Sequence, residues 1–290
     1  MIDGVITKGI GGFYYVATDR GTAECRARGK LRKAKITPAV GDKVAINIVN
    51  ENPLQGAVEE IYPRTNSLIR PPVANVDTVV IVIAATSPEP DYMMVDTLIA
   101  TAEQSGIEVI IVVNKTDIGS PDKTVSIYEK AGFKVVTACA VEGVGTDELR
   151  SLLGGKIAAF AGNSGVGKSS LLNALGFDLE TGEVSKIQRG RHTTRHVELL
   201  PLTPGSGYVI DTPGFSLLKV SDIKAAELSG CFREFNRHGK CRFGECTHFG
   251  TKPKDCAVAA AAASGAIEKS RYDSYLSIYN ELKDIKEWEI

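Results

Sequence analysis

The eight residues Gly162–Ser169 have the composition of a phosphate-binding loop. They match the pattern G-x-x-x-x-G-K-[ST] and lie between a run at 157–161 that favours a strand and a helical pattern at 170–175. Glycines let backbone N–H groups converge on phosphate oxygens, and the start of a helix favours negative charge. We expect Lys168 to reach the β- and γ-phosphates and Ser169 to bind Mg²⁺. The alternative, a glycine-rich turn with an incidental lysine, would not require the flanking strand and helix. The expected nucleotide-binding residues are Gly162, Asn163, Ser164, Gly165, Val166, Gly167, Lys168, Ser169 and Ser170.

A second motif, Asn114-Lys115-Thr116-Asp117, separates guanine from adenine. It follows an apolar run at 108–113 that favours a buried strand, and ligands bind at the carboxyl ends of such strands. Asp117 can accept hydrogen bonds from N1–H and the 2-amino group of guanine. Adenine offers neither donor, so the unpaired carboxylate would cost about 1–3 kcal/mol. We expect Asn114 to bond the N7 side of the base and Lys115 to lie over it. The alternative is that Asp117 is only a helix N-cap.

A further guanine-contacting loop is expected after the next strand, at 134–137. Cys139-Ala140 follows that strand and is the candidate. The usual pair at this place is Ser-Ala, so Cys139 is a departure from the common pattern.

The switch segments of the same site are expected between residues 189 and 214. Asp211-Thr212-Pro213-Gly214 follows a strand at 207–210, which would let Asp211 hold Mg²⁺ through a water and the Gly214 N–H meet the γ-phosphate. The preceding segment 189–196 is basic and contains glycine, which favours a loop. We expect Thr194 to bind Mg²⁺ together with Ser169, with Thr193 as the alternative; a surface loop with incidental charges is the competing interpretation.

The residue that positions the attacking water is expected in this loop as well. Ras-like enzymes place a glutamine after the switch glycine, but Phe215 follows Gly214 here and cannot polarise water. His192 is the best candidate, because imidazole can accept a proton or hydrogen bond near neutral pH. His196 is the second choice, RNA could supply part of the site, and a simple RNA contact by His192 is the alternative.

A late cluster of cysteine and histidine has the composition of a structural zinc site. Three thiolates and one imidazole make a closed Cys₃His tetrahedral set, the kind that holds structural zinc. Cys231 is a competing fourth ligand, and unligated thiols are the alternative interpretation. The expected zinc ligands are Cys241, Cys246, His248 and Cys256.

These motifs must be positioned by more than one kind of element. Residues 1–72 contain short β-rich runs broken by glycines, which favours a small barrel of the OB type. This segment has eleven Lys/Arg against seven Asp/Glu, a net charge of +4, and prolines at 63 and 71–72 indicate a linker. We expect an RNA-binding surface formed by Arg28, Lys30, Arg32 and Lys33 rather than by the neighbouring tyrosines.

Residues 73–218 alternate between apolar strand patterns and helical patterns, which predicts a parallel sheet with helices. The remaining segment, 219–290, is polar with cysteines and then helical. The strands are expected at 78–84, 108–113, 134–137, 156–161 and 207–210. The helices are expected at 92–105, 125–131, 146–153, 168–175, 257–263 and 272–286.

The bulk composition excludes several classes of protein. The chain of 290 residues is 43% hydrophobic and has a net charge of −1, which is ordinary for a globular protein and unlike a polycation. It contains no stretch of about 18 apolar residues and no basic segment followed by an apolar one at the start. We therefore expect a cytoplasmic monomer without a membrane partner, in which the six cysteines are not disulfide-bonded.

The motif order identifies a resemblance. The base-specificity motif at 114–117 precedes the phosphate-binding loop at 162–169, whereas most GTPases have the reverse order, so one site is circularly permuted. This order, with the segment 190–194 and the late Cys/His cluster, resembles the RsgA/YjeQ family over essentially the whole chain. The resemblance implies a multidomain α/β fold: an N-terminal OB barrel (1–72), a permuted P-loop GTPase domain (73–218) and a C-terminal zinc-binding helical domain (219–290). It supports the same four zinc ligands and His192.

The resemblance also implies a function. Members act in late maturation of the small ribosomal subunit, bind that subunit and its 16S rRNA, and hydrolyse GTP to GDP with stimulation by the subunit. Two alternatives remain open: a permuted GTPase that serves another RNA or the large subunit, and a nucleotide-dependent RNA-binding module without turnover. GTP turnover with and without small subunits would separate the three.

Overall fold

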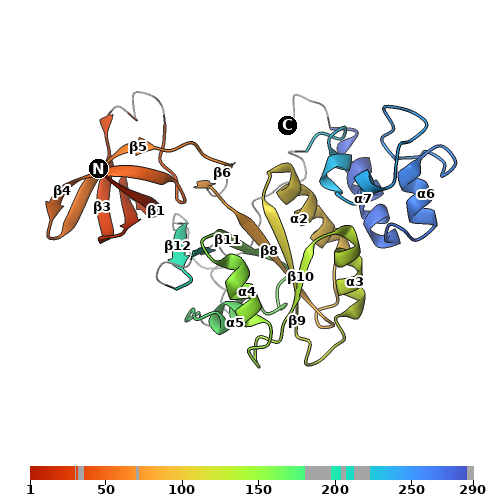
Figure 1. The fold of residues 1–290 in the computed structure, drawn as a ribbon, viewed down its shortest axis with the longest axis horizontal. Coiled ribbons are helices and arrows are strands. Elements are labelled where there is room, and N and C mark those ends of the chain that lie inside the picture. Colours follow the sequence, from red (N-terminus) through yellow and green to blue (C-terminus); the bar gives the residue numbers. More distant parts are fainter. Residues whose placement is uncertain are drawn as a thin grey trace. The chain divides into compact units, whose positions relative to one another are not determined.

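A computed structural model gives the structure of the protein and describes residues 1–29, 31, 36–69, 72–179, 197–203, 207–211 and 223–285. The chain, drawn in Figure 1, divides into two compact units. The first unit contains Met1–Thr78, Leu153–Ala159 and the described part of Gly182–Leu217. The second contains Val79–Leu152, Phe160–Thr181 and the described part of Leu218–Ile290.

The first unit begins with a closed barrel of five strands. Each strand pairs with its neighbours in the order β1–β2–β3–β5–β4, and β4 returns to pair with β1. Alternate residues point inward and form the core, which consists of Ile6, Val16, Ala23, Cys25, Leu31, Val44, Ile46 and Val58. The predicted OB-type barrel is thereby confirmed. Its strands are β1 (Ile2–Ile10), β2 (Phe13–Thr18), β3 (Gly21–Ala27), β4 (Lys43–Glu51) and β5 (Leu54–Ile61).

The segment that follows the barrel is ordered by side-chain hydrogen bonds. It contains a short hairpin of β6 (Ser67–Ile69) and β7 (Pro72–Ala74). Before the hairpin, Arg64 binds the fully buried Asp42 carboxylate through Nε at 2.7 Å and Nη2 at 2.8 Å. Asn75, after the hairpin, donates from Nδ2 to the Gly41 carbonyl oxygen at 3.0 Å. The expected linker is therefore fastened to the barrel.

Three further strands belong wholly or partly to the first unit: β11 (Ile157–Ala161), β12 (Glu198–Pro201) and β13 (Tyr208–Asp211). Strand β12 was not predicted, because four residues ending in proline give little periodic signal. It pairs antiparallel with β13 and with β1, where Lys8 and Glu198 are register partners and form an ion pair at 2.6 Å. The first residues of β11 pair in parallel with β13.

The second unit contains the strands that were predicted to be buried on both faces. Strands β8 (Thr78–Ala84), β9 (Glu108–Asn114) and β10 (Lys134–Thr137) lie in the order β10–β9–β8, with β10 parallel to β9. All seven residues of β8 are buried, as a continuous apolar run predicts for a covered strand.

Helices flank these three strands. Helices α2 and α3 lie on one side of the strands and α4 and α5 on the other (Figure 1). Helix α3 begins three residues earlier than predicted, directly after Pro121, whose φ of −81° is compatible with a helix start. Their bounds are α2 (Tyr92–Gln104), α3 (Asp122–Ala131), α4 (Thr146–Leu153) and α5 (Lys168–Ala174).

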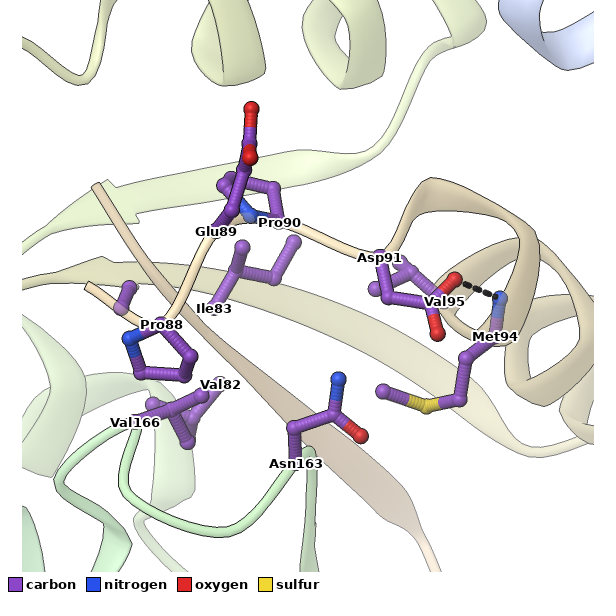
Figure 2. Close-up of a pocket in the computed structure, with 11 residues that line it drawn as sticks. Val82, Ile83, Pro88, Glu89, Pro90, Asp91, Met94, Val95, Asn163 and Val166 are labelled. Carbon is purple, nitrogen blue, oxygen red and sulfur yellow. Dashed lines mark hydrogen bonds between the residues drawn. The ribbon is translucent and has the colours of Figure 1, made fainter. Parts of the chain in front are cut away.

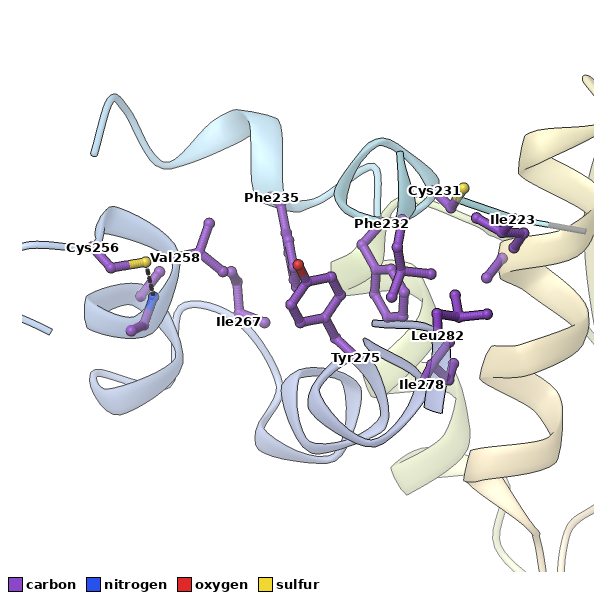
Figure 3. Packing of buried hydrophobic residues seen from close by; sticks show 14 residues of the cluster. Ile223, Cys231, Phe232, Phe235, Cys256, Val258, Ile267, Tyr275, Ile278 and Leu282 are labelled. Atoms are coloured by element: carbon purple, nitrogen blue, oxygen red, sulfur yellow. Dashed lines mark hydrogen bonds between the residues drawn. The ribbon is translucent and has the colours of Figure 1, made fainter. Parts of the chain in front are cut away.

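The C-terminal part of the second unit is a small helical module. It has two 3₁₀ turns, η2 (Leu228–Cys231) and η3 (Phe235–Arg237), and two helices, α6 (Ala257–Ala263) and α7 (Lys269–Leu282). Phe232, Phe235 and Tyr275 form the centre of its apolar core (Figure 3). The core also includes Ala100 of α2, so this module and α2 share buried surface. Within the described residues, no helix has the length and apolar character needed to cross a membrane.

Candidate functional site

The phosphate-binding motif forms the loop between β11 and α5, as its spacing predicts. Gly162 has a φ of 136°, and a Cβ at that position would lie 2.2 Å from the Val82 carbonyl oxygen. Gly167 has a φ of 92°, and its Cβ would lie 2.3 Å from Asn114 Nδ2. Only glycine fits either position, because the backbone of the loop approaches β8 and the base-specificity motif so closely.

The lysine of this motif points back over its own loop. Lys168 Nζ donates to the carbonyl oxygens of Gly162 and Asn163, both at 2.8 Å. Burial lowers the pKa of this ammonium below its ordinary value. A cationic group with protein carbonyls as its partners therefore lies at the place where the sequence predicts phosphate oxygens.

The base-specificity motif begins with a buried amide that joins two loops. Asn114, the last residue of β9, is 1% exposed. Its Nδ2 donates to the Val166 carbonyl oxygen of the phosphate-binding loop at 3.0 Å, and its Oδ1 accepts from the Ala140 N–H at 3.1 Å. The structure thus brings the phosphate-binding loop, the base-specificity motif and the Cys139-Ala140 loop together around one side chain. A bond from Asn114 to the base stays a prediction.

A cavity of about 210 Å³ opens where these three segments meet. Asp117 lines it, as the guanine prediction requires. Two apolar residues also line it, Ile118 and Val141, which are 57% and 79% exposed. Sequence reasoning missed both, since apolar side chains beside a motif do not reveal that they border a cavity. The lining residues are Asn114, Lys115, Asp117, Ile118, Ala140, Val141, Gly167 and Ser170.

The two central residues of the motif are held by backbone carbonyls. Lys115 has a φ of 64° and donates from Nζ to the Ser87 carbonyl oxygen at 2.6 Å. Thr116 donates from Oγ1 to the Ala138 carbonyl oxygen at 3.2 Å. The lysine side chain is therefore anchored along the cavity wall. No sequence signal marked Ser87, which contributes only its backbone.

Cys139 is buried and is not among the residues that line the cavity. It is 2% exposed, and its backbone N–H and C=O both pair with Val144 at 3.1 Å. Burial raises the pKa of its thiol, and the neighbouring Asp117 carboxylate raises it further. A neutral thiol thus replaces the usual serine, and the Ala140 backbone keeps its contact with Asn114.

The predicted switch residues are only partly described. Asp211 is the last residue of β13, so its backbone has the expected place at a strand end. The other predicted residues of these segments, including His192, Thr194 and Gly214 and the alternatives Thr193 and His196, lie outside the described residues.

The four predicted zinc ligands form one cluster. Their Sγ and ring nitrogen atoms all lie within 4.8 Å of one another. Cys241 Sγ is 3.8 Å from Cys256 Sγ, and His248 Nδ1 is 3.5 Å and 3.4 Å from these two sulfurs. Zn–S bonds of about 2.3 Å in a tetrahedron separate two sulfurs by about 3.8 Å, so the donor set fits zinc.

Backbone amides at the start of α6 support the cysteine sulfurs. Ala257 N–H donates to Cys241 Sγ at 3.4 Å, and Ala259 N–H donates to Cys256 Sγ at 3.3 Å. Burial raises the pKa of the Cys256 thiol to about 11, and the bond from the Ala259 N–H opposes this rise. The alternative ligand Cys231 is not in the cluster: its thiol is buried in the module core, 3.5 Å from Gln104 Oε1.

Comparison with known proteins places both units in one family. The family model described as RsgA GTPase matches residues 61–221, and the model described as RsgA N-terminal domain matches residues 3–56. Two proteins named small ribosomal subunit biogenesis GTPase RsgA are similar over nearly full length. The protein from Caldanaerobacter subterraneus is 49% identical, covering 98% of this chain and 96% of that protein. The protein from Alkaliphilus metalliredigens is 44% identical, covering 98% of both.

Two solved structures share the fold. The structure of YjeQ from Thermotoga maritima matches with a TM-score of 0.84 and 33% identity, covering 98% of this chain and 99% of that one. The structure of YloQ, described as a circularly permuted GTPase, matches with a TM-score of 0.81 and 36% identity, covering 99% and 96%. These matches explain why the base-specificity motif precedes the phosphate-binding loop. The chain belongs to the RsgA GTPase family and is a circularly permuted GTP hydrolase.

Proposed function

We propose that this GTPase acts in late maturation of the small (30S) ribosomal subunit and that the subunit stimulates its hydrolysis of GTP. The observation behind this proposal is the near full-length similarity, at 49% and 44% identity, to proteins named for small ribosomal subunit biogenesis. The cavity at Asp117 supports a guanine nucleotide as the substrate. Ribosome assembly would place the activity in the cytoplasm, and we expect the chain to act as a monomer.

The proposed roles in the nucleotide site follow from chemistry and position. Asp117 accepts from the guanine edge, and the methylene stem of Lys115 borders the base. Lys168 and the N–H groups of the phosphate-binding loop bind the phosphates. Ser169 and Thr194 would hold Mg²⁺, which would offset the negative charge of the phosphates. Asp211 and Gly214 complete the phosphate side, and His192 positions the attacking water.

The proposed domains divide these tasks. Residues 1–72 form an RNA-binding barrel, 73–218 the GTPase domain and 219–290 the zinc-binding domain. The Cys₃His cluster holds one structural zinc. The RNA surface includes Arg28, whose side chain is 55% exposed and forms an ion pair with Glu59 at 2.8 Å. Part of the Arg28 charge is therefore already compensated. The other three residues of the proposed 16S rRNA-binding surface, Lys30, Arg32 and Lys33, lie outside the described residues.

A turnover assay tests the proposal. GTP hydrolysis is measured for the purified chain alone, with purified small subunits and with large subunits at the same concentration. We expect slow turnover alone and faster turnover only with small subunits. Equal stimulation by large subunits, or none by either, would contradict the proposed partner. ATP in place of GTP serves as the control for base specificity.

A further inference from the structure

Helix α2 connects the phosphate-binding loop to the Cys/His module within the second unit. Its first turn is capped by Asp91, whose Oδ1 accepts from the Met94 N–H at 3.0 Å. Met94 and Val95 line a cavity of about 10 Å³ together with Asn163 and Val166 of the phosphate-binding loop, and Asn163 faces Met94 across it (Figure 2). A space of this size holds about one water, so little room separates the helix from the loop.

Asp96, the residue after Val95, belongs to a fully buried ionic cluster. Asp96 is 0% exposed, and its Oδ1 accepts from Arg271 Nη1 at 2.8 Å and from the Tyr128 hydroxyl at 3.1 Å. Arg271, on α7, is 1% exposed and also binds both carboxylate oxygens of Glu234, at 2.8 Å and 3.1 Å. The Phe232 ring lies 4.6 Å from the guanidinium. One cation therefore ties α2 to two elements of the C-terminal module.

The same turn of α7 also holds the metal cluster. The Tyr272 hydroxyl, next to Arg271, donates to the His248 carbonyl oxygen at 2.8 Å, and the Tyr275 hydroxyl donates to the Thr247 carbonyl oxygen. A continuous series of contacts thus runs from the Cys/His cluster through α7 and Arg271 to Asp96, and from there along α2 to the phosphate-binding loop.

The buried charges make this connection sensitive to substitution. A buried ion pair stabilises little relative to apolar residues, but removal of one partner leaves an uncompensated charge. Among the residues that the structure describes, Arg271 is the only cation bound to both Asp96 and Glu234, and its planar fork makes both contacts possible. A lysine at position 271 would keep the positive charge but lose the planar fork. We therefore expect α2 to shift against the Cys/His module rather than to separate from it.

We propose that Arg271 is a positioning residue for nucleotide binding: by fixing α2 to the Cys/His module, it holds the phosphate-binding loop in its nucleotide-binding conformation. The inference rests on the guanine-nucleotide site of the proposed function. It also means that the metal cluster, although separate from the nucleotide, contributes to nucleotide affinity. Coupling between two sites typically changes affinity on the order of 5- to 150-fold.

The test compares Arg271→Lys with Lys269→Met. Lys269 lies on the same helix, is 81% exposed and is paired with Asp273, so it is a matched control. Three properties of the full chain are measured: its affinity for fluorescent GDP, its zinc content, and the amide hydrogen exchange of residues 162–167. We expect Arg271→Lys to weaken GDP binding about tenfold, raise KM with little change in kcat, and speed exchange in the loop, with zinc retained. Lys269→Met should change none of these.

Two outcomes overturn the proposal. In the first, the Arg271→Lys variant folds, retains zinc and binds GDP with wild-type affinity. That result would show that α2 does not position the phosphate-binding loop. If the Arg271→Lys variant does not fold, zinc is removed from the wild-type chain with a chelator and its affinity for GDP is measured. An unchanged affinity in the zinc-free protein would also overturn the proposal. A wild-type chain that does not prefer GDP to ADP would instead contradict the guanine assignment, so the two failures are distinguishable.

Discussion

Two side chains three residues apart, Asn114 and Asp117, have different surroundings in the base-specificity motif. Asn114 is buried and bonded at both ends of its amide to other loops, whereas Asp117 is exposed and faces the cavity. Substitution of Asn114 would therefore disturb the loops themselves, and substitution of Asp117 would act on the base. Asp117 is therefore the better residue to substitute when the base specificity of the site is measured.

Asp117→Asn should weaken GTP binding about 10- to 100-fold, because hydrogen bonds to a charged group contribute about 1.5–3 kcal/mol. It should also shift preference toward xanthine nucleotides, whose 2-oxo group matches an amide donor. Titration of fluorescent guanosine and xanthosine diphosphates measures both effects. Asp122→Asn, at the exposed start of α3, is the control. Unchanged GTP affinity in Asp117→Asn would remove this residue from the site.

His192→Ala should abolish hydrolysis stimulated by the small subunit and leave GTP affinity and subunit binding nearly intact. The reason is that an imidazole can orient the attacking water, and we expect docking on the subunit to be coupled to this step. Turnover assays and pelleting with small subunits measure the two properties. His196→Ala is compared in parallel, since it is the second candidate. Full stimulation of His192→Ala would assign the water to another group.

Among the secondary-structure elements, the barrel strand β3 leads into the basic segment 28–33, which contains the four residues of the proposed RNA surface. Strand β3 ends at Ala27, directly before the basic segment, and Arg28 beyond it pairs with Glu59 of β5. Strand β3 pairs with β2 along one edge and with β5 along the other. The basic segment therefore follows a strand that is fixed on both edges, and its charges can be removed without opening the barrel.

Replacement of Arg28, Lys30, Arg32 and Lys33 by glutamine should weaken small-subunit binding and flatten its salt dependence. Each lost phosphate contact should reduce the slope of log K against log salt by roughly 0.7–0.9. Binding is measured at several salt concentrations, with GTP affinity as the test of an intact fold. Lys269→Gln, on exposed α7 surface, should leave the slope unchanged. A quadruple variant with the wild-type slope would assign RNA binding to another surface.

For the molecule as a whole, the C-terminal module and α2 behave as one packed body. Ala100 of α2 belongs to the core of the module, and Arg233 of the module binds the Glu103 carboxylate of α2 and the Gly132 carbonyl oxygen. Arg271 adds the buried ionic cluster to these contacts. Loss of the metal should therefore loosen the nucleotide-binding unit and not only the last residues of the chain.

Purified protein should contain about one zinc per chain, and a chelator should lower its unfolding temperature, because metal binding is coupled to folding in such clusters. Cys246→Ser should lower the zinc content. Cys231→Ser should retain zinc, since that thiol lies in the apolar core instead of the cluster. Metal analysis and thermal unfolding measure these effects. Full stability of metal-free protein, or zinc loss in Cys231→Ser alone, would contradict the assigned ligands.

The sequence by itself determined the features that depend on near neighbours. The phosphate-binding loop, the base-specificity motif and the alternation of strands and helices each occupy short contiguous stretches, so their residue types and spacing suffice to predict them. The sequence also left Cys231 and Cys256 as alternative ligands. That choice required the tertiary structure, because the turns that bring Cys256 to Cys241 are not visible in spacing alone.

Only the tertiary structure decided the contacts between residues far apart in the chain. Asn114 meets Val166 across 52 positions, Arg271 meets Asp96 across 175, and Lys8 meets Glu198 across 190. Strand β12, with four residues, exists because β1 and β13 pair with it and not because its own sequence favours a strand. Local patterns specify the secondary-structure elements. Which buried polar groups pair is selected by the packing free energy of the whole chain. Those pairings join the Cys/His cluster to the phosphate-binding loop.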